Sequence, residues 1–199
     1  YNYVDLEKDI DEKELIIWWY SIWTALAMDF ASENEFDKII LDSPLSSRYD
    51  MSRYYMWFAL QKVFFMKNTF VSSDLVKNIS NDLLVIHWND DKIVPFYQWK
   101  KIFDNSISKN KFLVEIDSQG HTQTIENYGK SLKYIISWFL NEKNNTYFSS
   151  WYLLIDNKNK EKLENEMWID LEKDDSIQKF VTSNLSFDDK SYIPSNLVS

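Results

Sequence analysis

Four short apolar runs constrain the fold of this chain more than any other feature of the sequence. They are LIIW (15–18), KIILD (38–42), LLVIH (83–87) and FLVEI (112–116). Runs of this length, rich in Ile, Leu and Val, are typical of strands buried on both faces of a sheet. Segments with a helical pattern of apolar residues separate or follow them, at 21–32, 49–66, 95–105 and 123–140. Strands that alternate with helices predict an α/β fold with a doubly wound, mostly parallel sheet.

Composition excludes several classes of function. A net charge of −9 argues against a nucleic-acid partner, because such proteins use clustered Lys and Arg to contact phosphates. No apolar run reaches the roughly 20 residues that a transmembrane helix needs, so we predict none. The absence of cysteine excludes a disulfide framework, a thiolate zinc site and a cysteine nucleophile.

Glycine and tryptophan depart from ordinary usage in opposite directions. The chain has 2 glycines in 199 residues, whereas about 7% is typical, and it has 9 tryptophans. Glycine is the main supplier of positive φ angles at turns. Either the fold avoids such turns, or some tryptophans occupy positions where a glycine is expected.

Ser21 is the first candidate for a catalytic role. It lies in ELIIWWYSIWTALAMDF (14–30), where an apolar run ends and a helical pattern begins. A nucleophile at a strand-to-helix turn is held on a strained backbone, and the next N–H, from Ile22, would contribute to an oxyanion hole at the helix N-terminus. The ordinary alternative is a serine that caps the helix.

Two further segments carry acid and base candidates. LLVIHWNDDKIVP (83–95) places two aspartates after a strand, where catalytic groups gather in open α/β sheets, although a charged turn explains them equally well. FLVEIDSQGHTQTIENY (112–128) places His121 in a loop after the next strand. A lone histidine is usually structural, but a loop position suits a general base.

Taken together, these segments resemble the α/β-hydrolase superfamily, in particular its serine-aminopeptidase-like and Bem46-like members. WYSIWTALAMDFASE is similar to the G-x-S-x-G elbow and its helix, and DKIILDSPLSS to the following strand with its SP exit. LLVIHWNDDKIVP is similar to the H-G-x-x-D-x-x-V-P acid loop, and GHT to the histidine turn. The resemblance implies Ser21 as nucleophile, Asp91 as acid and His121 as base. Asp90 and Asp42 are alternative candidates for the acid.

The resemblance also implies a mechanism and a domain organisation. A serine hydrolase of this type cleaves an ester, thioester or amide through an acyl-enzyme, on a small-molecule or acylated substrate, without a metal or organic cofactor. Residues 1–141 would be the C-terminal portion of the domain, lacking its N-terminal strands, with 43–82 as a cap-like insertion region. Residues 142–199 would be a polar linker and an extension of uncertain role, in which WYLLI (151–155) could form a strand. Neither oligomeric state nor localisation is predicted; cytoplasmic location and membrane association through an upstream N-terminus both stay open.

Trp19, Trp23 and Trp88 fall where the family carries glycine. Indole rings at 19 and 23 are expected to clash with the neighbouring helix, strand or substrate and to destroy the elbow. We favour the hypothesis that all three are glycines, because some uncultured bacterial lineages read UGA as glycine, and translating it as tryptophan would deplete glycine and enrich tryptophan together. The alternative is that the tryptophans are genuine and the protein is a catalytically inactive binding module.

Overall fold

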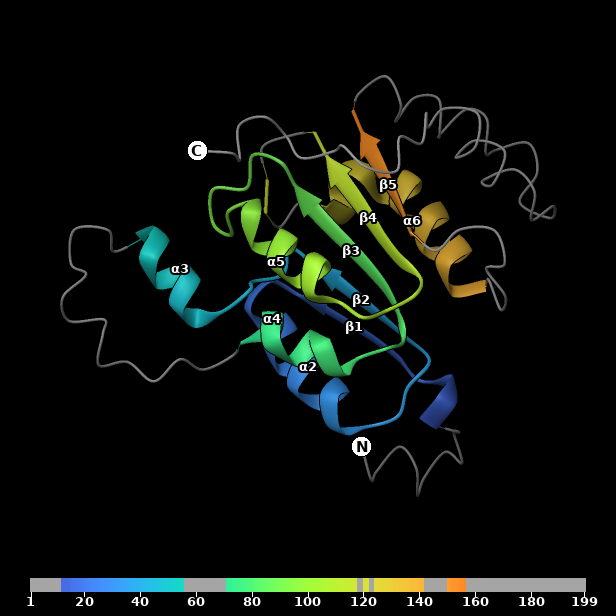
Figure 1. Ribbon diagram of the computed structural model, residues 1–199. Helices are drawn as coiled ribbons and strands as arrows, with labels where there is room; N and C mark the ends of the chain where they lie inside the picture. The colour runs from blue at the N-terminus through green and yellow to red at the C-terminus, as the bar shows by residue number, and fades with distance from the viewer. Residues whose placement is uncertain (1–11, 56–70, 118–119, 122–123, 142–149, 157–199) are drawn as a thin grey trace.

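A five-stranded parallel sheet forms the centre of the computed structural model, which describes residues 12–55, 71–117, 120–121, 124–141 and 150–156. Its strands are β1 (Ile16–Tyr20), β2 (Lys38–Asp42), β3 (Asp82–Trp88), β4 (Lys111–Ile116) and β5 (Ser150–Ile155). Their spatial order is β1-β2-β3-β4-β5, and every neighbouring pair is parallel (Figure 1). The predicted α/β fold with a mostly parallel sheet is confirmed, and WYLLI does form a strand.

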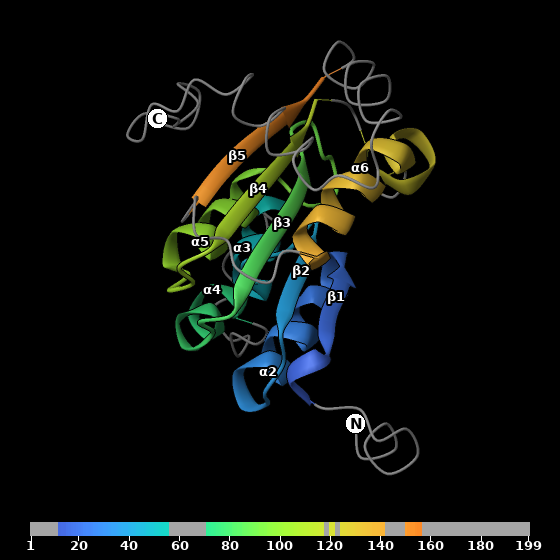
Figure 2. The same cartoon turned by 90° about the vertical axis from the view of Figure 1, so that its right-hand side faces the viewer.

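Helices cover both faces of this sheet (Figures 1 and 2). The long helix α6 (Thr124–Asn141) covers one face, and α2 (Thr24–Glu33), α4 (Ser72–Leu75) and α5 (Tyr97–Asn105) cover the other. Helix α3 (Arg48–Tyr55) lies beyond the C-terminal end of β2. Short 3₁₀ turns complete the described elements: η1 (Glu12–Glu14), η2 (Ser21–Trp23) and η4 (Val76–Asn78).

Two apolar cores explain why the strands read as continuous hydrophobic runs. In β2, Ile40 packs into the core beneath α6, whereas its neighbours Ile39 and Leu41 pack into the core beneath α2 and α5. Alternate residues of a strand point to opposite faces, so a strand covered on both sides must be apolar throughout. All five residues of β2 are buried as a result.

Some element boundaries differ from the sequence predictions. The helix predicted over 21–32 is divided into η2 and α2, and α5 begins after Pro95 and Phe96 rather than at the proline. The helix predicted over 49–66 begins at Arg48 and is described to Tyr55; the rest of it lies outside the described residues, as does most of 142–199. Helix α4 was not predicted, because four residues carry too little periodicity to be recognised.

β1 forms one edge of the sheet and pairs only with β2 among the described strands. This edge and the helix start beside it expose large apolar side chains: Ile16, Trp18, Trp19, Ile22, Trp23 and Leu26. The described part of the sheet therefore ends in an apolar edge, and such an edge favours association with another chain. Across the part of the chain that the structure describes, no helix is both long enough and apolar enough to cross a bilayer.

Candidate active site

The C-terminal ends of the parallel strands bring the three candidate residues to one edge of the sheet. Ser21 directly follows β1, Asp91 lies in the loop after β3, and His121 lies in the loop after β4. In a parallel sheet every strand ends at the same edge, which is where open α/β sheets place their ligands. The sequence prediction that each residue follows a separate strand is confirmed.

Ser21 forms a strained turn between β1 and η2. Its φ angle is 53°, and only Ser43, at 48°, shares a positive φ among the described residues other than glycine. This conformation costs an L-residue roughly 1 to 2 kcal/mol, so the surroundings must hold it. The Thr24 hydroxyl donates a 2.6 Å hydrogen bond to the Ser21 carbonyl and ties the turn to the first residue of α2. The backbone geometry of a nucleophile elbow is thus present.

The expectation that tryptophans at 19 and 23 destroy this elbow is wrong for this structure. Trp19 and Trp23 are 45% and 54% exposed, so each keeps about half of its surface open to solvent. Steric exclusion needs a neighbour to clash with, and at this edge of the described sheet β1 has no strand on its outer side. The strained serine and both bulky side chains therefore coexist.

A continuous chain of hydrogen bonds joins the three candidates. Ser21 Oγ lies 2.8 Å from His121 Nε2, and His121 Nδ1 lies 2.7 Å from Asp91 Oδ2. Because a carboxylate only accepts, Nδ1 carries the proton and Nε2 is left to accept the proton of the serine hydroxyl. This arrangement can withdraw a proton from Ser21 and so activate it as a nucleophile.

Asp91 is held firmly by its own loop. Its Oδ1 accepts hydrogen bonds from the backbone N–H groups of Ile93 and Val94, both at 2.8 Å, while Oδ2 faces His121. The residue is 5% exposed. Three N–H donors fix the orientation of this buried carboxylate. The carboxylate can therefore keep the imidazole in one tautomer.

The histidine loop must cross the end of β3 to reach the serine. β1 and β4 are separated by two strands, which places them roughly 14 Å apart. Trp88, the last residue of β3, is fully buried, and its indole lies against Gly120 of this loop. A β-carbon at Gly120 would lie 2.9 Å from Cε3 of Trp88, closer than nonbonded carbon atoms approach. Only glycine fits there, so the Trp88 indole and Gly120 together position His121.

His87 is a functional candidate that sequence reasoning missed. It is completely buried in β3, its Nε2 donates a 3.0 Å hydrogen bond to the Val94 carbonyl, and the same nitrogen is 3.9 Å from Asp91 Oδ2. Burial lowers the pKa of His87 to about 4, so the ring is neutral at physiological pH. The side chain ties the end of β3 to the far end of the acid loop. The only signal in the sequence was a second histidine inside the acid-loop motif.

The alternative acids lie in different surroundings. Asp90 pairs with Lys92 on the surface. Asp42, at the end of β2, is buried, and burial raises its pKa to about 7, with the negative charge of Asp91 adding to the effect. Burial also raises the pKa of Tyr20 to about 12, and the Tyr20 ring lies 5.1 Å from that of His121. Of the three carboxyl groups, Asp91 is the one bonded to His121.

Ile22 follows Ser21 as expected and belongs to η2 at the start of the helix. Its backbone N–H is therefore at the positive end of the helix dipole, where developing negative charge is stabilised. In the described segments no cluster of three or more His, Asp or Glu side chains is arranged to hold a metal ion.

Comparisons with known proteins agree with this architecture. No protein-family model matches the chain. It is 29% identical over 116 residues to the lysophosphatidylserine lipase ABHD12 of Danio rerio, covering 50% of this chain and 30% of that protein, and 28% identical over 110 residues to the Xenopus tropicalis protein, covering 47% and 28%. The chain thus spans about 30% of the length of these curated relatives.

Solved structures share the fold at low sequence identity. The acylaminoacyl peptidase of Pyrococcus horikoshii superposes with a TM-score of 0.60 at 17% identity, covering 74% of this chain and 27% of that one. The esterase Pf2001 of Pyrococcus furiosus gives 0.56 at 20% identity, covering 70% and 57%. Both matches cover most of this chain and only part of the other.

Proposed function

From the premise that this chain belongs to the α/β-hydrolase superfamily, we propose that it is part of a serine hydrolase in which Ser21 is the nucleophile, His121 the general base and Asp91 the acid. The observation that carries the proposal is the unbroken hydrogen-bond chain from Ser21 Oγ through His121 to Asp91. A binding module has no need for a strained serine aligned with a buried imidazole and carboxylate. The arrangement therefore favours catalysis over the inactive alternative.

The first half of the reaction forms an acyl-enzyme. His121 Nε2 takes the hydroxyl proton as Ser21 Oγ bonds to the carbonyl carbon of an ester, thioester or amide, and the carbonyl oxygen becomes an oxyanion. The Ile22 N–H donates to that oxyanion. When the intermediate collapses, the bond to the leaving group breaks and His121 gives its proton to the departing oxygen, sulfur or nitrogen.

Water completes the cycle by the same steps. His121 removes a proton from water as its oxygen attacks the acyl carbon, and then returns that proton to Ser21 Oγ as the acid product leaves. Asp91 stabilises the cationic imidazole in both halves. No step needs a metal or an organic cofactor.

The similar proteins support an acyl substrate but differ in what they cleave. They include a lysophosphatidylserine lipase, an acylaminoacyl peptidase and an esterase. These share cleavage at an acyl carbonyl. We therefore propose a small-molecule or acylated substrate and leave the leaving group open among alcohols, thiols and amines.

Active-site labelling tests the proposal. Two versions of the protein are prepared, one as written and one carrying Trp19→Gly, Trp23→Gly and Trp88→Gly, and each is treated with a fluorophosphonate probe that reacts with activated serines. We expect labelling at Ser21 in at least one version, located by peptide mass spectrometry. Ser21→Ala is the matched control and should abolish the label.

The pattern of labelling distinguishes the readings of the sequence. Labelling of the version as written means that the elbow tolerates both tryptophans, whereas labelling of the glycine version alone supports the UGA hypothesis. Asp91→Asn should keep the fold and lower ester turnover roughly 10⁴-fold, because the imidazole loses its correct tautomer. The absence of any label in two folded samples would overturn the hydrolase proposal.

A further inference from the structure

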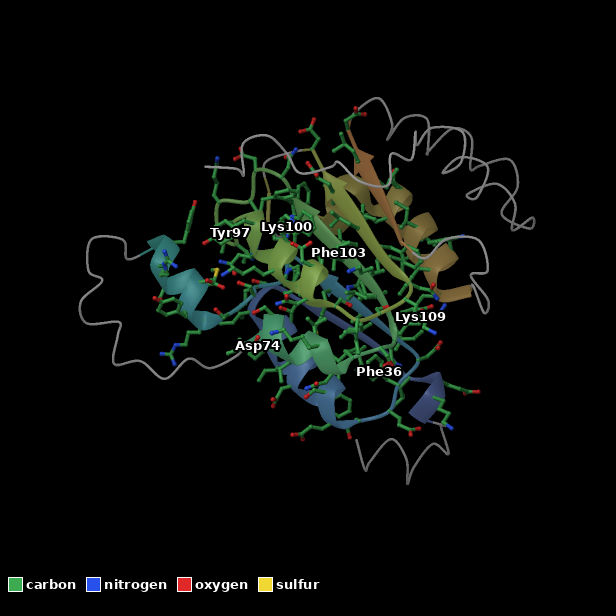
Figure 3. The ribbon with its side chains drawn as sticks, in the orientation of Figure 1. Phe36, Asp74, Tyr97, Lys100, Phe103 and Lys109 are labelled. Carbon is green, nitrogen blue, oxygen red and sulfur yellow. The ribbon has the colours of Figure 1, made fainter. Side chains whose placement is uncertain are left out.

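A cavity of about 470 Å³ lies outside the serine, histidine and aspartate site. It is lined by Asp50, Arg53 and Tyr54 of α3 and by Tyr97 and Lys101 of α5. Cavities of this size accommodate small ligands or one part of a larger one. Tyr97, labelled in Figure 3, is the first residue of α5. The cavity is thus built between the helix that follows β2 and the helix that follows the acid loop.

The charges lining this cavity do not cancel. Lys101 Nζ lies 2.6 Å from Asp50 Oδ1, so these two residues form an ion pair. The other oxygen of Asp50 accepts hydrogen bonds from the hydroxyls of Ser46 and Ser47, at 2.6 and 3.1 Å. Arg53 forms no ion pair within the described part of the chain, and its guanidinium lies 5.8 Å from the ring centroid of Tyr49. Among the described residues that line the cavity, two positive charges therefore face one negative charge.

The shape of the lining suits an oxyanion attached to an apolar body. Two tyrosines, Tyr54 and Tyr97, line the cavity, and the Tyr97 hydroxyl lies 3.4 Å from the Asp50 carbonyl, which ties α3 to α5. A guanidinium presents parallel N–H donors that match the oxygens of a phosphate or a carboxylate. Because the chain as a whole has a net charge of −9, an anion is attracted only where a cation is locally uncompensated.

The cavity lies at the end of the sheet where the triad residues meet. Helix α5 begins two residues after Pro95, at the end of the acid loop that holds Asp91. Tyr54 lies close enough to Lys92, the residue after Asp91, for the two groups to interact electrostatically. A substrate whose carbonyl is at Ser21 could therefore extend toward this cavity along the acid loop.

We propose that the cavity between α3 and α5 binds an anionic group, a phosphate or a carboxylate, of the substrate, with Arg53 as its main contact. This inference rests on the proposed function for the reaction, whereas binding of the anion itself requires no chemistry. Arg53 is then a specificity-determining residue, and the neighbouring Lys101 is occupied in holding Asp50.

Three esters with the same acyl chain test the proposal: a monoacylglycerol, the corresponding monoacylglycerol phosphate, and the acyl ester of a hydroxycarboxylic acid. We expect Arg53→Ala to lower the ratio of kcat/KM for an anionic ester to that for the neutral ester roughly tenfold or more, mainly through KM. Arg53→Lys, which keeps the charge but loses the planar fork, should lower it less. Arg48→Ala, on the same helix but outside the cavity, is the matched control and should leave the ratio unchanged.

The three esters distinguish a phosphate from a carboxylate as the bound anion. They also distinguish failure of the anion site from failure of the proposed hydrolase function. Loss of preference for the phosphate ester alone, or for the carboxylate ester alone, identifies the group that is bound. An unchanged ratio in Arg53→Ala for both anionic esters overturns the anion site while the hydrolase proposal stands. If no ester is cleaved and no serine is labelled, binding of inorganic phosphate tests the anion site by itself. Phosphate should raise the Tm of the wild type but not that of Arg53→Ala. Equal shifts in the two proteins would overturn the site.

Discussion

The elbow and the acid–base region contribute to one site yet differ sharply in how they are covered. In the elbow, residues 16–26, the side chains of Trp19 and Trp23 are 45% and 54% exposed. In the acid–base region, residues 82–95 and 111–121, Trp88 is 0% exposed. All three tryptophans occupy positions where the α/β-hydrolase superfamily carries glycine. Their different burial means that the same substitution has different consequences in the two regions.

This difference shows that the elements packed over a position decide how large a side chain can be accommodated there. Trp88 is buried against Gly120, so its ring fills space that other residues define. Trp19 and Trp23 lie at a sheet edge that no described strand covers. In the family, glycine at the elbow permits close approach of neighbouring elements, and close approach matters only where a neighbour is present.

The largest stability effect in this comparison is expected at Trp88. Trp88→Gly should lower the free energy of unfolding by about 3 to 5 kcal/mol, because it removes a large buried ring and leaves a cavity beneath the histidine loop. The measurement is equilibrium unfolding in urea, followed by circular dichroism. Trp88→Phe, which keeps part of the ring volume, should recover part of this loss.

An increase in stability for Trp88→Gly would break the comparison. It would mean that the histidine loop closes over a glycine in the natural protein, and it would support the reading of UGA as glycine at this position.

An intermediate effect on the free energy of unfolding is expected when Asp42 is replaced. Its pKa of about 7 in the folded state lies above the ordinary value of 3.8. Its contribution to stability is therefore complete below pH 3.8 and is lost as the pH rises through 7. From pH 5 to pH 8 the free energy of unfolding of Asp42→Asn should rise by about 3 kcal/mol relative to the wild type, since asparagine cannot ionise.

The pH dependence must be measured as a difference between variant and wild type, because the pKa shift of His87 changes the free energy of unfolding with pH in the opposite direction. Its pKa is lowered from 6.5 to about 4, so its stabilising contribution is present above pH 6.5 and is lost as the pH falls toward 4. The two slopes partly cancel in the wild type but not in the difference. Asp90→Asn, at the surface, is the control. A difference for Asp42→Asn that does not vary with pH would contradict the burial of this carboxyl group.

The smallest effects are expected in the elbow. Trp19→Gly and Trp23→Gly should each change the free energy of unfolding by no more than about 1 kcal/mol, because each indole keeps much of its exposure in the folded state and the main cost is that of a glycine in a strand or helix start. The same urea series measures both variants. A loss comparable to that of Trp88→Gly would show that another part of the protein covers this edge.

The source organism provides an independent check on the same positions. Tandem mass spectrometry of the native peptide from Glu14 to Lys38 reads residues 19 and 23 directly. Glycine at both positions would support the UGA hypothesis, and tryptophan at both would leave the exposed elbow as the natural arrangement.

The sequence by itself determined the strands, their alternation with helices and the order of Ser21, Asp91 and His121. These features follow from local pattern: a strand buried on both faces must be apolar throughout, and polar residues that follow such a run lie at the C-terminal edge of a parallel sheet. Each strand, and the polar residue that follows it, can be recognised from its immediate neighbours along the chain.

Local pattern left three carboxyl groups as candidates for the acid, and only the resemblance to a known family put Asp91 first. Tertiary structure alone decided the surroundings of each carboxyl group, which tryptophan is buried, and how His87 holds the acid loop. Asp42, Asp90 and Asp91 are the same residue type after similar strands, and only their positions in space separate a buried group with a raised pKa, a surface ion pair and a partner for imidazole. Burial and hydrogen bonding depend on neighbours that are distant along the chain. The 2.8 Å contact between Ser21 and His121 joins residues that are 100 positions apart, and no local pattern of residues encodes such a distance.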